Sequence, residues 1–143
     1  MTPSDIAVLE ERLGVQLPDD WKEVVLNYPV ALMQIARHDG ESVADYEIVD
    51  DLGWLLQLND EVRLEPIIDR HNMAFDWPDS YFVIGENGYN DYYLVDVDNP
   101  KLGVLLFDHM ECDFEVQADD LAEFIDLILR QYDPEALSGE LEE

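Results

Sequence analysis

The sequence predicts an α+β fold, with a central antiparallel sheet packed against helices from both ends of the chain. Two observations support this prediction. Apolar residues recur at helical spacing near both ends of the 143 residues, and three strand-like runs with short links lie between residues 81 and 109. Short links favour an antiparallel β-meander in the second half of the chain, because parallel strands need long crossover connections.

The first 29 residues predict two helices. Thr2 is placed to cap the first helix, Pro3 suits its first position, and Gly14 ends it. Pro18 begins the second helix and Pro29 ends it. The expected buried faces are Ile6, Leu9 and Leu13 on the first helix, and Trp21, Val24, Val25 and Tyr28 on the second.

The middle of the chain carries weaker signals. Residues 30–36 fit either a strand or a continued helix, residues 37–41 fit a turn, and residues 42–50 alternate like a strand. Residues 51–65 have helical spacing, and residues 67–80 form a connector with some apolar anchors. The expected inward face of the helix at 51–65 is Leu52, Leu55, Leu56, Leu58 and Val62.

The second half of the chain is clearer. Strands are predicted at 81–85, 91–97 and 102–109, with a short edge strand at 114–118. Asn87-Gly88 predicts a hairpin turn, because both residues tolerate positive φ. The last helix is predicted at 119–132. Its expected inward face is Leu121, Phe124, Ile125, Ile128 and Leu129. We expect residues 1–133 to form a single domain, with the acidic residues 134–143 as a frayed tail.

Charge is the most unusual feature of the composition. The chain has 7 Lys plus Arg against 35 Asp plus Glu, a formal net charge of −28. Such a surface repels phosphate, which disfavours nucleic acid and anionic membranes as partners, and it attracts basic proteins. Solubility alone is the simpler explanation for the acidity. A signal-peptide pattern and a membrane-length apolar run are both missing, and Cys112 is the single cysteine, so we expect a cytoplasmic protein.

Known catalytic motifs do not match this sequence. The glycines of residues 85–97 precede a strand, and the segment has no lysine, which argues against a phosphate-binding loop. Its acids also lack the spacing of a calcium loop. In the segment 108–113, Asp108 and His109 are neighbours on a strand and are not expected to converge. Cys112 has no basic neighbour to activate it. We predict no catalytic residue, metal or cofactor, and a hydrolase or metal enzyme is the least favoured alternative.

The acidic residues are a better functional lead than any motif. Residues 38–51 hold six carboxylates without a lysine or arginine, Asp60 and Glu61 follow, and further acids flank the predicted hairpin. This pattern fits either a solvated face or a docking surface in which aromatic side chains, Tyr92 among them, act as anchors. The candidate partner-binding residues are Asp39, Glu41, Asp45, Tyr46, Glu47, Asp50, Asp51, Trp54, Glu86, Tyr89 and Asp91.

Several ordered segments resemble the Smi1/Knr4 family, also called the SUKH superfamily. "LEERLGVQLPDDWKEVVLNY" resembles its opening through Leu13-Gly14, Leu17-Pro18 and Trp21, and "GVLLFDHMEC" its strand ending in D-H-E. "ADDLAEFIDLIL" resembles its final helix. "IGENGYNDYYLVDV" resembles the family segment I-G-x-x-G-x-G-D-x-Y-x-x-D through Ile84, Gly85, Gly88, Asp91, Tyr93 and Asp96. The departures from the pattern are Tyr28-Pro29, Asn90 and Met110, and the resemblance covers about residues 6 to 130.

This resemblance implies an α+β fold around an antiparallel sheet, and no catalytic residues. Bacterial members of the family are immunity proteins that bind and block toxins, often nucleases. The resulting prediction is a non-enzymatic immunity protein that occludes a cognate, basic toxin. The alternative is an intracellular adaptor or regulator of the same fold that has no toxin partner. A monomer or weak dimer is expected.

Overall fold

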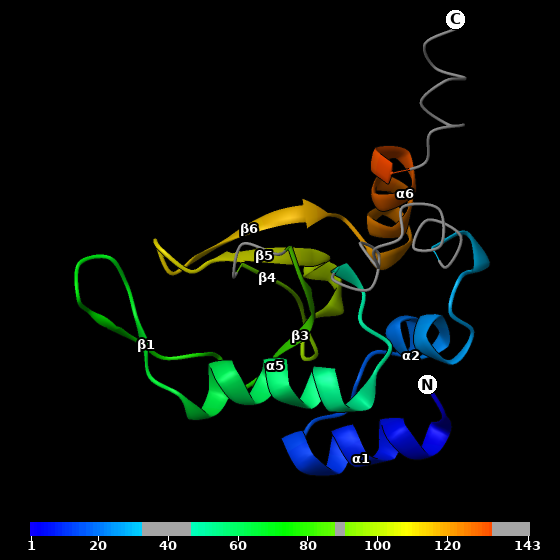
Figure 1. The fold of residues 1–143 in the computed structure, drawn as a ribbon, viewed down its shortest axis with the longest axis horizontal. Coiled ribbons are helices and arrows are strands. Elements are labelled where there is room, and N and C mark those ends of the chain that lie inside the picture. The colour runs from blue at the N-terminus through cyan, green and yellow to red at the C-terminus, as the bar shows by residue number, and fades with distance from the viewer. Residues whose placement is uncertain (33–46, 88–90, 133–143) are drawn as a thin grey trace, which may run out of the picture.

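The computed structural model describes residues 1–32, 47–87 and 91–132, and it has the predicted α+β architecture. Helices α1 (Pro3–Leu13) and α2 (Asp19–Leu26) come first and are followed by α5 (Leu52–Leu64), as Figure 1 shows. Helix α6 (Leu121–Tyr132) follows the last strand and stands at one end of the sheet. Within these described ranges, no helix combines the length and apolarity needed to span a membrane.

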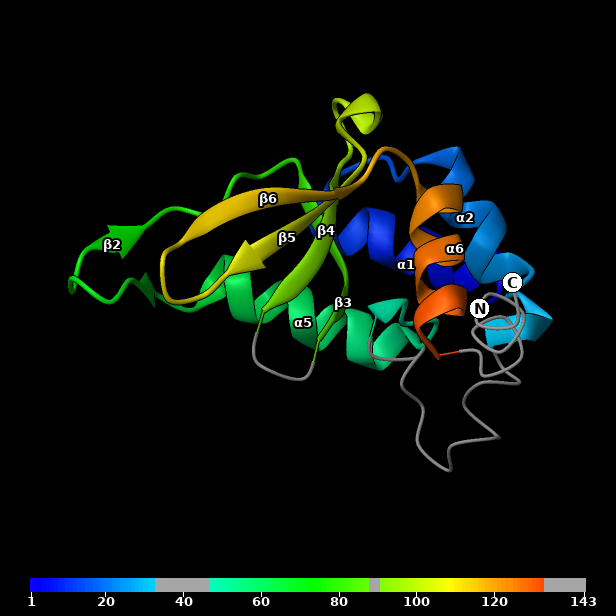
Figure 2. The same cartoon turned by 90° about the horizontal axis from the view of Figure 1, so that it is seen from above.

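The main sheet is the predicted antiparallel meander (Figure 2). It consists of β3 (Tyr81–Glu86), β4 (Tyr92–Asp96), β5 (Val104–Asp108) and β6 (Asp113–Ala118), in that spatial order. The expected edge strand at 114–118 is therefore confirmed as β6. A 3₁₀ turn, Pro100–Leu102, links β4 to β5 and ends at Gly103, whose φ of 81° favours glycine.

The region expected to be a connector also contains two short strands. Strands β1 (Ile67–Ile68) and β2 (Ala74–Phe75) pair antiparallel and form an arm that projects from the body of the molecule (Figures 1 and 2). The Arg70 backbone N–H donates to the Met110 carbonyl oxygen, and the Arg70 guanidinium pairs with Glu111 at 3.0 Å. These contacts tie the arm to the turn between β5 and β6.

The N-terminal helix is capped as its sequence predicts. The Thr2 hydroxyl accepts a hydrogen bond from the Asp5 backbone N–H, and the Asp5 carboxylate accepts one from the Thr2 backbone N–H. This reciprocal pair satisfies two of the amide groups that a helix leaves open at its start. Gly14 ends α1 in the left-handed conformation, with φ of 70°.

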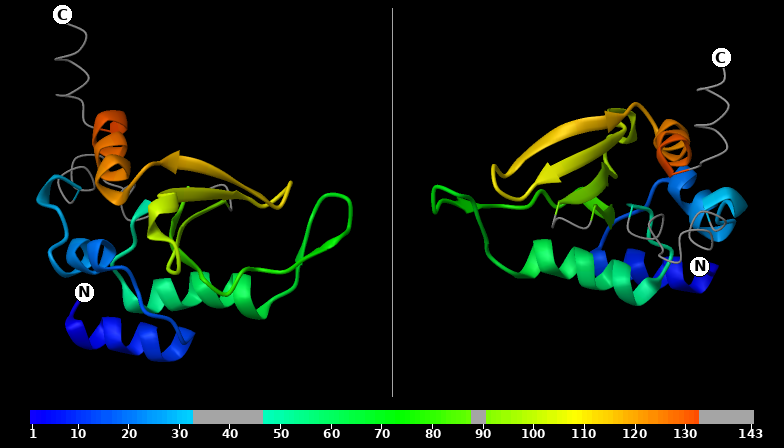
Figure 3. Two further views of the ribbon diagram at one scale, coloured as in Figure 1. Left: turned by 180° about the vertical axis from the view of Figure 1, so that it is seen from behind. Right: turned by 45° about the horizontal axis from the view of Figure 1, so that its top comes forward.

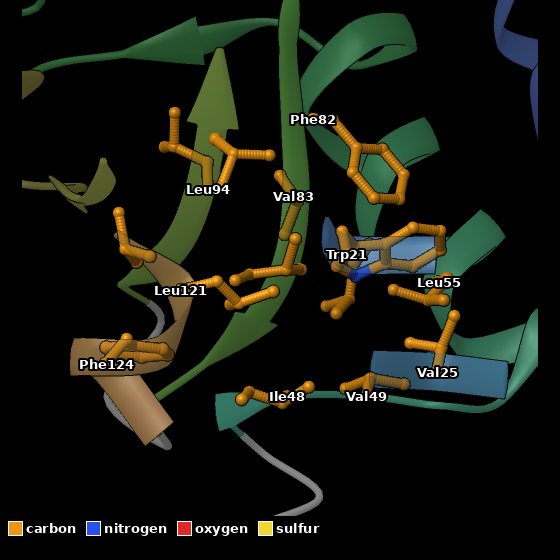
Figure 4. Close-up of a cluster of buried hydrophobic side chains, with 14 of the residues drawn as sticks. Trp21, Val25, Ile48, Val49, Leu55, Phe82, Val83, Leu94, Leu121 and Phe124 are labelled. Carbon is orange, nitrogen blue, oxygen red and sulfur yellow. The ribbon is translucent and has the colours of Figure 1, made fainter. Parts of the chain in front are cut away.

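One core joins the helices to the sheet, as Figure 4 shows for its centre. Trp21 of α2 meets Phe82 of β3 edge to face, with ring centroids 4.9 Å apart, and Tyr93 of β4 packs on Phe124 of α6. The predicted inward faces are confirmed by the buried residues Ile6, Leu9, Trp21, Val25, Leu55, Leu58, Val62, Leu121, Phe124 and Ile128. The remaining members of those faces are partly buried against this core.

The strand expected at 42–50 is wrong for its described part. Glu47 is helical, and residues 48–50 are irregular. The Val49 N–H donates to the Ile84 carbonyl oxygen at 2.9 Å, but the chain then turns into the cap of α5 instead of continuing along β3. Residues 30–32 are helical, which answers the open choice for that part of 30–36. The rest of both predictions lies outside the described residues.

Helix α5 lies along the edge of the sheet formed by β3 and runs beneath the strands (Figure 3). The side chain of Asn59, a residue of α5, is fully buried. The Asn59 amide accepts from the Val83 N–H at 2.9 Å and donates to the Val83 carbonyl oxygen at 3.0 Å. Asn59 thus gives Val83 the two hydrogen bonds that a neighbouring strand would supply.

Candidate functional site

Six of the eleven candidate partner-binding residues lie in the part of the chain that the structure describes, and five lie outside it. Asp51 and Trp54 lie at the start of α5, while Glu86 and Asp91 flank the β3–β4 connection. The candidates Asp39, Glu41, Asp45, Tyr46 and Tyr89 lie outside the described residues. The other two candidates, Glu47 and Asp50, lie just before α5.

At the start of α5, a hydrogen bond from the backbone holds the Asp51 side chain in place. Asp51 is exposed, and its carboxylate accepts a hydrogen bond of 2.8 Å from the Trp54 backbone N–H. This is a side-chain cap that suits the positive end of a helix. Asp51 therefore has a structural role in addition to being available at the surface.

Glu47 has a different environment from the other candidates. It is only 5% exposed, and it lines a hollow between β4 and α6 together with Tyr93 and Phe124. Burial, with Glu47 and Asp91 nearby, raises the pKa of Tyr93 to about 12. A carboxylate this buried is not part of the outer acidic surface.

Asp91 connects two turns of the sheet. Its backbone carbonyl oxygen accepts from the Asn87 N–H at 3.1 Å, which closes the predicted hairpin. Its carboxylate oxygen Oδ1 lies 2.6 Å from His109 Nδ1 and accepts from the His109 backbone N–H at 3.1 Å. Burial alone would raise the pKa of Asp91, but the hydrogen bonds from His109 and Asn87 lower it overall.

The expectation that Asp108 and His109 would not converge is wrong. One ligand atom from each of Asp91, Asp108 and His109 lies within 4.8 Å of the others. The cause is the pairing of β4 with β5, in which Tyr92 lies opposite Phe107 and Asp91 therefore comes beside the end of β5. His109 is the first residue of the tight turn that follows, so strand alternation no longer applies to it, and its backbone and ring nitrogens both meet the Asp91 carboxylate.

These three groups could hold a divalent cation, but hydrogen bonds within the protein already engage them. The Asp108 carboxylate accepts from the backbone N–H groups of Met110 and Glu111, at 2.8 and 3.3 Å, and Asp91 holds His109. The geometry thus has a complete structural explanation as a clamp between the two turns. Burial and the nearby Asp69, Asp108 and Asp113 raise the pKa of Cys112, which disfavours its thiolate at neutral pH.

A further acidic group lies between α5 and the sheet. Glu61 of α5, Glu65 directly after α5 and Glu86 of β3 all act on Tyr92 of β4, and the Tyr92 hydroxyl donates to the Glu61 carboxylate at 3.1 Å. Burial raises the pKa of Tyr92 strongly, and the three carboxylates raise it further. Burial is the main cause that raises the pKa of Glu86, and the nearby charge of Glu61 raises it further. We call Glu61, Glu65, Glu86 and Tyr92 the α5 acidic cluster.

Sequence analysis identified part of the α5 acidic cluster but missed Glu65 and the fact that its members meet. Glu61 and Glu65 are four residues apart, a spacing that puts two acids on one face of the helix expected at 51–65, although Glu65 is in fact the extended residue that ends α5. That signal was readable in the sequence. The approach of Glu86 and Tyr92 was not, because it depends on how α5 sits against β3.

These features define a small α+β protein with an antiparallel meander, flanking helices and a strongly acidic exterior. Residues 3–125 match the family model SUKH_6, described as SMI1-KNR4 cell-wall, and the chain belongs to this family. The predicted resemblance is thus confirmed. Proteins of this family are generally non-enzymatic.

A named relative comes from Bacillus subtilis (strain 168) and is called "Uncharacterized protein YnaB". This chain is similar to it, with 30% identity over 108 residues, which cover 74% of this chain and 58% of the relative. The chain therefore spans less than two thirds of that relative's length. No solved structure matches the chain.

Proposed function

We propose that this chain is a non-enzymatic immunity protein that acts in the cytoplasm and neutralises a cognate, basic, nuclease-type toxin by occlusion. The observation that carries the proposal is the excess of carboxylates, 35 against 7 lysines and arginines, on a fold of the SMI1-KNR4 family. Nucleases bind phosphate and are therefore basic on the face that contacts their substrate. An acidic protein attracts that face and blocks it.

The distribution of ion pairs supports this proposal. Four of the described Lys and Arg residues pair with Asp60, Glu10, Glu111 and Asp126. Among residues 1–32, 47–87 and 91–132, the carboxylates of the α5 acidic cluster have no Lys or Arg ion pair. Their mutual repulsion is then relieved only by cations from outside the described chain, such as those of a basic partner.

The test is co-expression and co-purification with the product of an adjacent toxin gene. The expected result is a stoichiometric complex that lacks nuclease activity and protects cells from the toxin. Calorimetric titration at about 50 and about 200 mM salt should show a large loss of affinity at the higher concentration, because the interface is electrostatic. The protein alone should cleave no nucleic acid.

Two outcomes would contradict the proposal. One is protection of cells without formation of a complex, because the chain would then have to act on the product of the toxin's reaction and not on the toxin. The other is a binding constant that salt does not change, which would remove charge as the basis of recognition. A partner that is itself acidic would favour the adaptor alternative.

A further inference from the structure

The outer face of α5 combines carboxylates with an exposed leucine. The inner face of α5 packs Leu55, Leu58 and Val62 into the core. The opposite face forms a shallow hollow lined by Leu56, Gln57, Asp60, Glu61, Leu64 and Glu65. Leu64 is 74% exposed, more than any other large apolar side chain among the described residues. Together with the half-buried Leu56, Leu64 gives this acidic face an apolar centre that a partner can cover.

Glu61 is held in place within this face. Its two carboxylate oxygens accept from the Tyr92 hydroxyl at 3.1 Å and from the Gln57 amide at 3.4 Å. A carboxylate that is fixed before binding loses less side-chain entropy when a cation arrives. The face is therefore partly preorganised for a positive group.

Two cations of the protein lie near this face, but neither pairs with the acids of the α5 acidic cluster. The Arg63 guanidinium donates to the carbonyl oxygens of Asp79 and Tyr81, and Asp60 is the acid of this hollow that acts on it. Arg12 pairs with Asp60 at 3.0 Å at the border with α1. Neither forms an ion pair with Glu61, Glu65 or Glu86 in the described part of the chain.

We propose that this face of α5, with Glu86 and Tyr92 beside it, docks a basic segment of the toxin that carries an apolar side chain between cationic ones. The apolar side chain contacts Leu64 and Leu56, and the lysines or arginines meet Glu61, Glu65 and Glu86. This inference rests on the proposed function and locates its centre of contact. Charge complementarity selects the occupant, because a second copy of this chain would place carboxylates against carboxylates.

The docking face can be tested without the toxin by using a defined peptide. The probe is a helical 14-residue peptide of leucine and lysine, titrated into the ¹⁵N-labelled full chain at low salt. Two control peptides replace lysine with glutamate or leucine with serine. We expect amide shifts centred on α5 and β4 with the first peptide, none with the glutamate peptide, and weaker binding of the serine peptide.

Variants then separate this face from net charge. Glu61→Gln with Glu86→Gln, and Leu64→Ser alone, should each weaken peptide binding about tenfold. The matched controls make the same changes on β6 and α6: Glu115→Gln with Glu123→Gln, and Val116→Ser, which starts at 56% exposure. The controls should change affinity by less than about twofold. Thermal unfolding verifies that every variant is folded.

Equal weakening by the two double variants would overturn the docking face, because only net charge would then matter. Shifts centred on another element would overturn it as well. If the α5 variants bind the toxin as tightly as the wild type does, the docking face is contradicted and the proposed immunity function is not. Peptide docking on α5 without any toxin binding supports the face and contradicts the immunity function.

Discussion

Replacing Asn59 is expected to destabilise the protein strongly, although the residue is far from any proposed contact. The Asn59 side chain is fully buried and makes three hydrogen bonds: to the Leu55 carbonyl oxygen and to both backbone groups of Val83. In Asn59→Ala, the Val83 N–H and carbonyl oxygen lose these partners inside the core. Each of the two unsatisfied buried groups costs about 1–3 kcal/mol, so the expected loss is about 2–6 kcal/mol.

This loss would be a large fraction of the roughly 5–15 kcal/mol that stabilises a typical domain. It corresponds to a fall in melting temperature of roughly 10 °C for a chain of this size. Urea unfolding at neutral pH measures the change directly. Gln57→Ala is the matched control, since Gln57 is an exposed amide on the same helix, and it should change stability by less than about 0.5 kcal/mol.

A second variant distinguishes hydrogen bonding from packing. Asn59→Leu keeps a side chain of similar volume but cannot bond Val83. If the hydrogen bonds dominate, Asn59→Leu should be destabilised nearly as much as Asn59→Ala. A leucine variant within about 1 kcal/mol of the wild type would refute the reasoning, because burial of an apolar group would then compensate for the loss of the edge hydrogen bonds.

Three further predictions concern single residues. Asp91→Asn should lower stability at pH 6.5. The lowered pKa of Asp91 makes its contribution complete above the unfolded value of about 3.9, and the contribution is lost as pH falls through the folded pKa; urea midpoints of variant and wild type should therefore converge as the pH is lowered below that unfolded value. Glu86→Gln should raise stability at pH 7. The raised pKa of Glu86 means that its charge destabilises the fold above that pKa and has no effect below about pH 4, so an equal gain at pH 3.5 would contradict the cause. Cys112 should react with a disulfide reagent more slowly at pH 7 than a free thiol does, with its rate profile displaced toward alkaline pH, since its pKa is raised.

Local signals allowed the helices and the meander to be predicted. The Thr2 cap, the Gly14 stop and the spacing of apolar residues each depend on neighbours within one or two turns, and the sequence displays them directly. The β3–β4 hairpin was readable for the same reason. These elements needed no knowledge of tertiary contacts.

Features that depend on contacts between distant segments could not be predicted. Strands β1 and β2 have two residues each, too few for a periodic pattern, and the arm's tie to the β5–β6 turn depends on Arg70. His109 meets Asp91 because β4 pairs with β5 and the chain leaves β5 at His109, a pairing of two separate segments of the chain. In the sequence, Asn59 is one polar residue on a helix, and nothing there shows that it faces a strand edge.

The same contacts connect stability to the proposed docking face. Asn59 fixes α5 against β3, and Tyr92 fixes Glu61 on the opposite side of the helix. A partner therefore meets acids whose positions the fold has already set, so less ordering free energy is lost on binding. The raised pKa of Glu86 shows that holding a carboxylate there is unfavourable for the isolated protein. A substitution that stabilises the free chain while weakening binding is the behaviour expected of a residue kept for recognition. Glu86→Gln tests both properties in one variant: a gain in stability without any loss of binding would identify Glu86 as a surface acid with no role in docking.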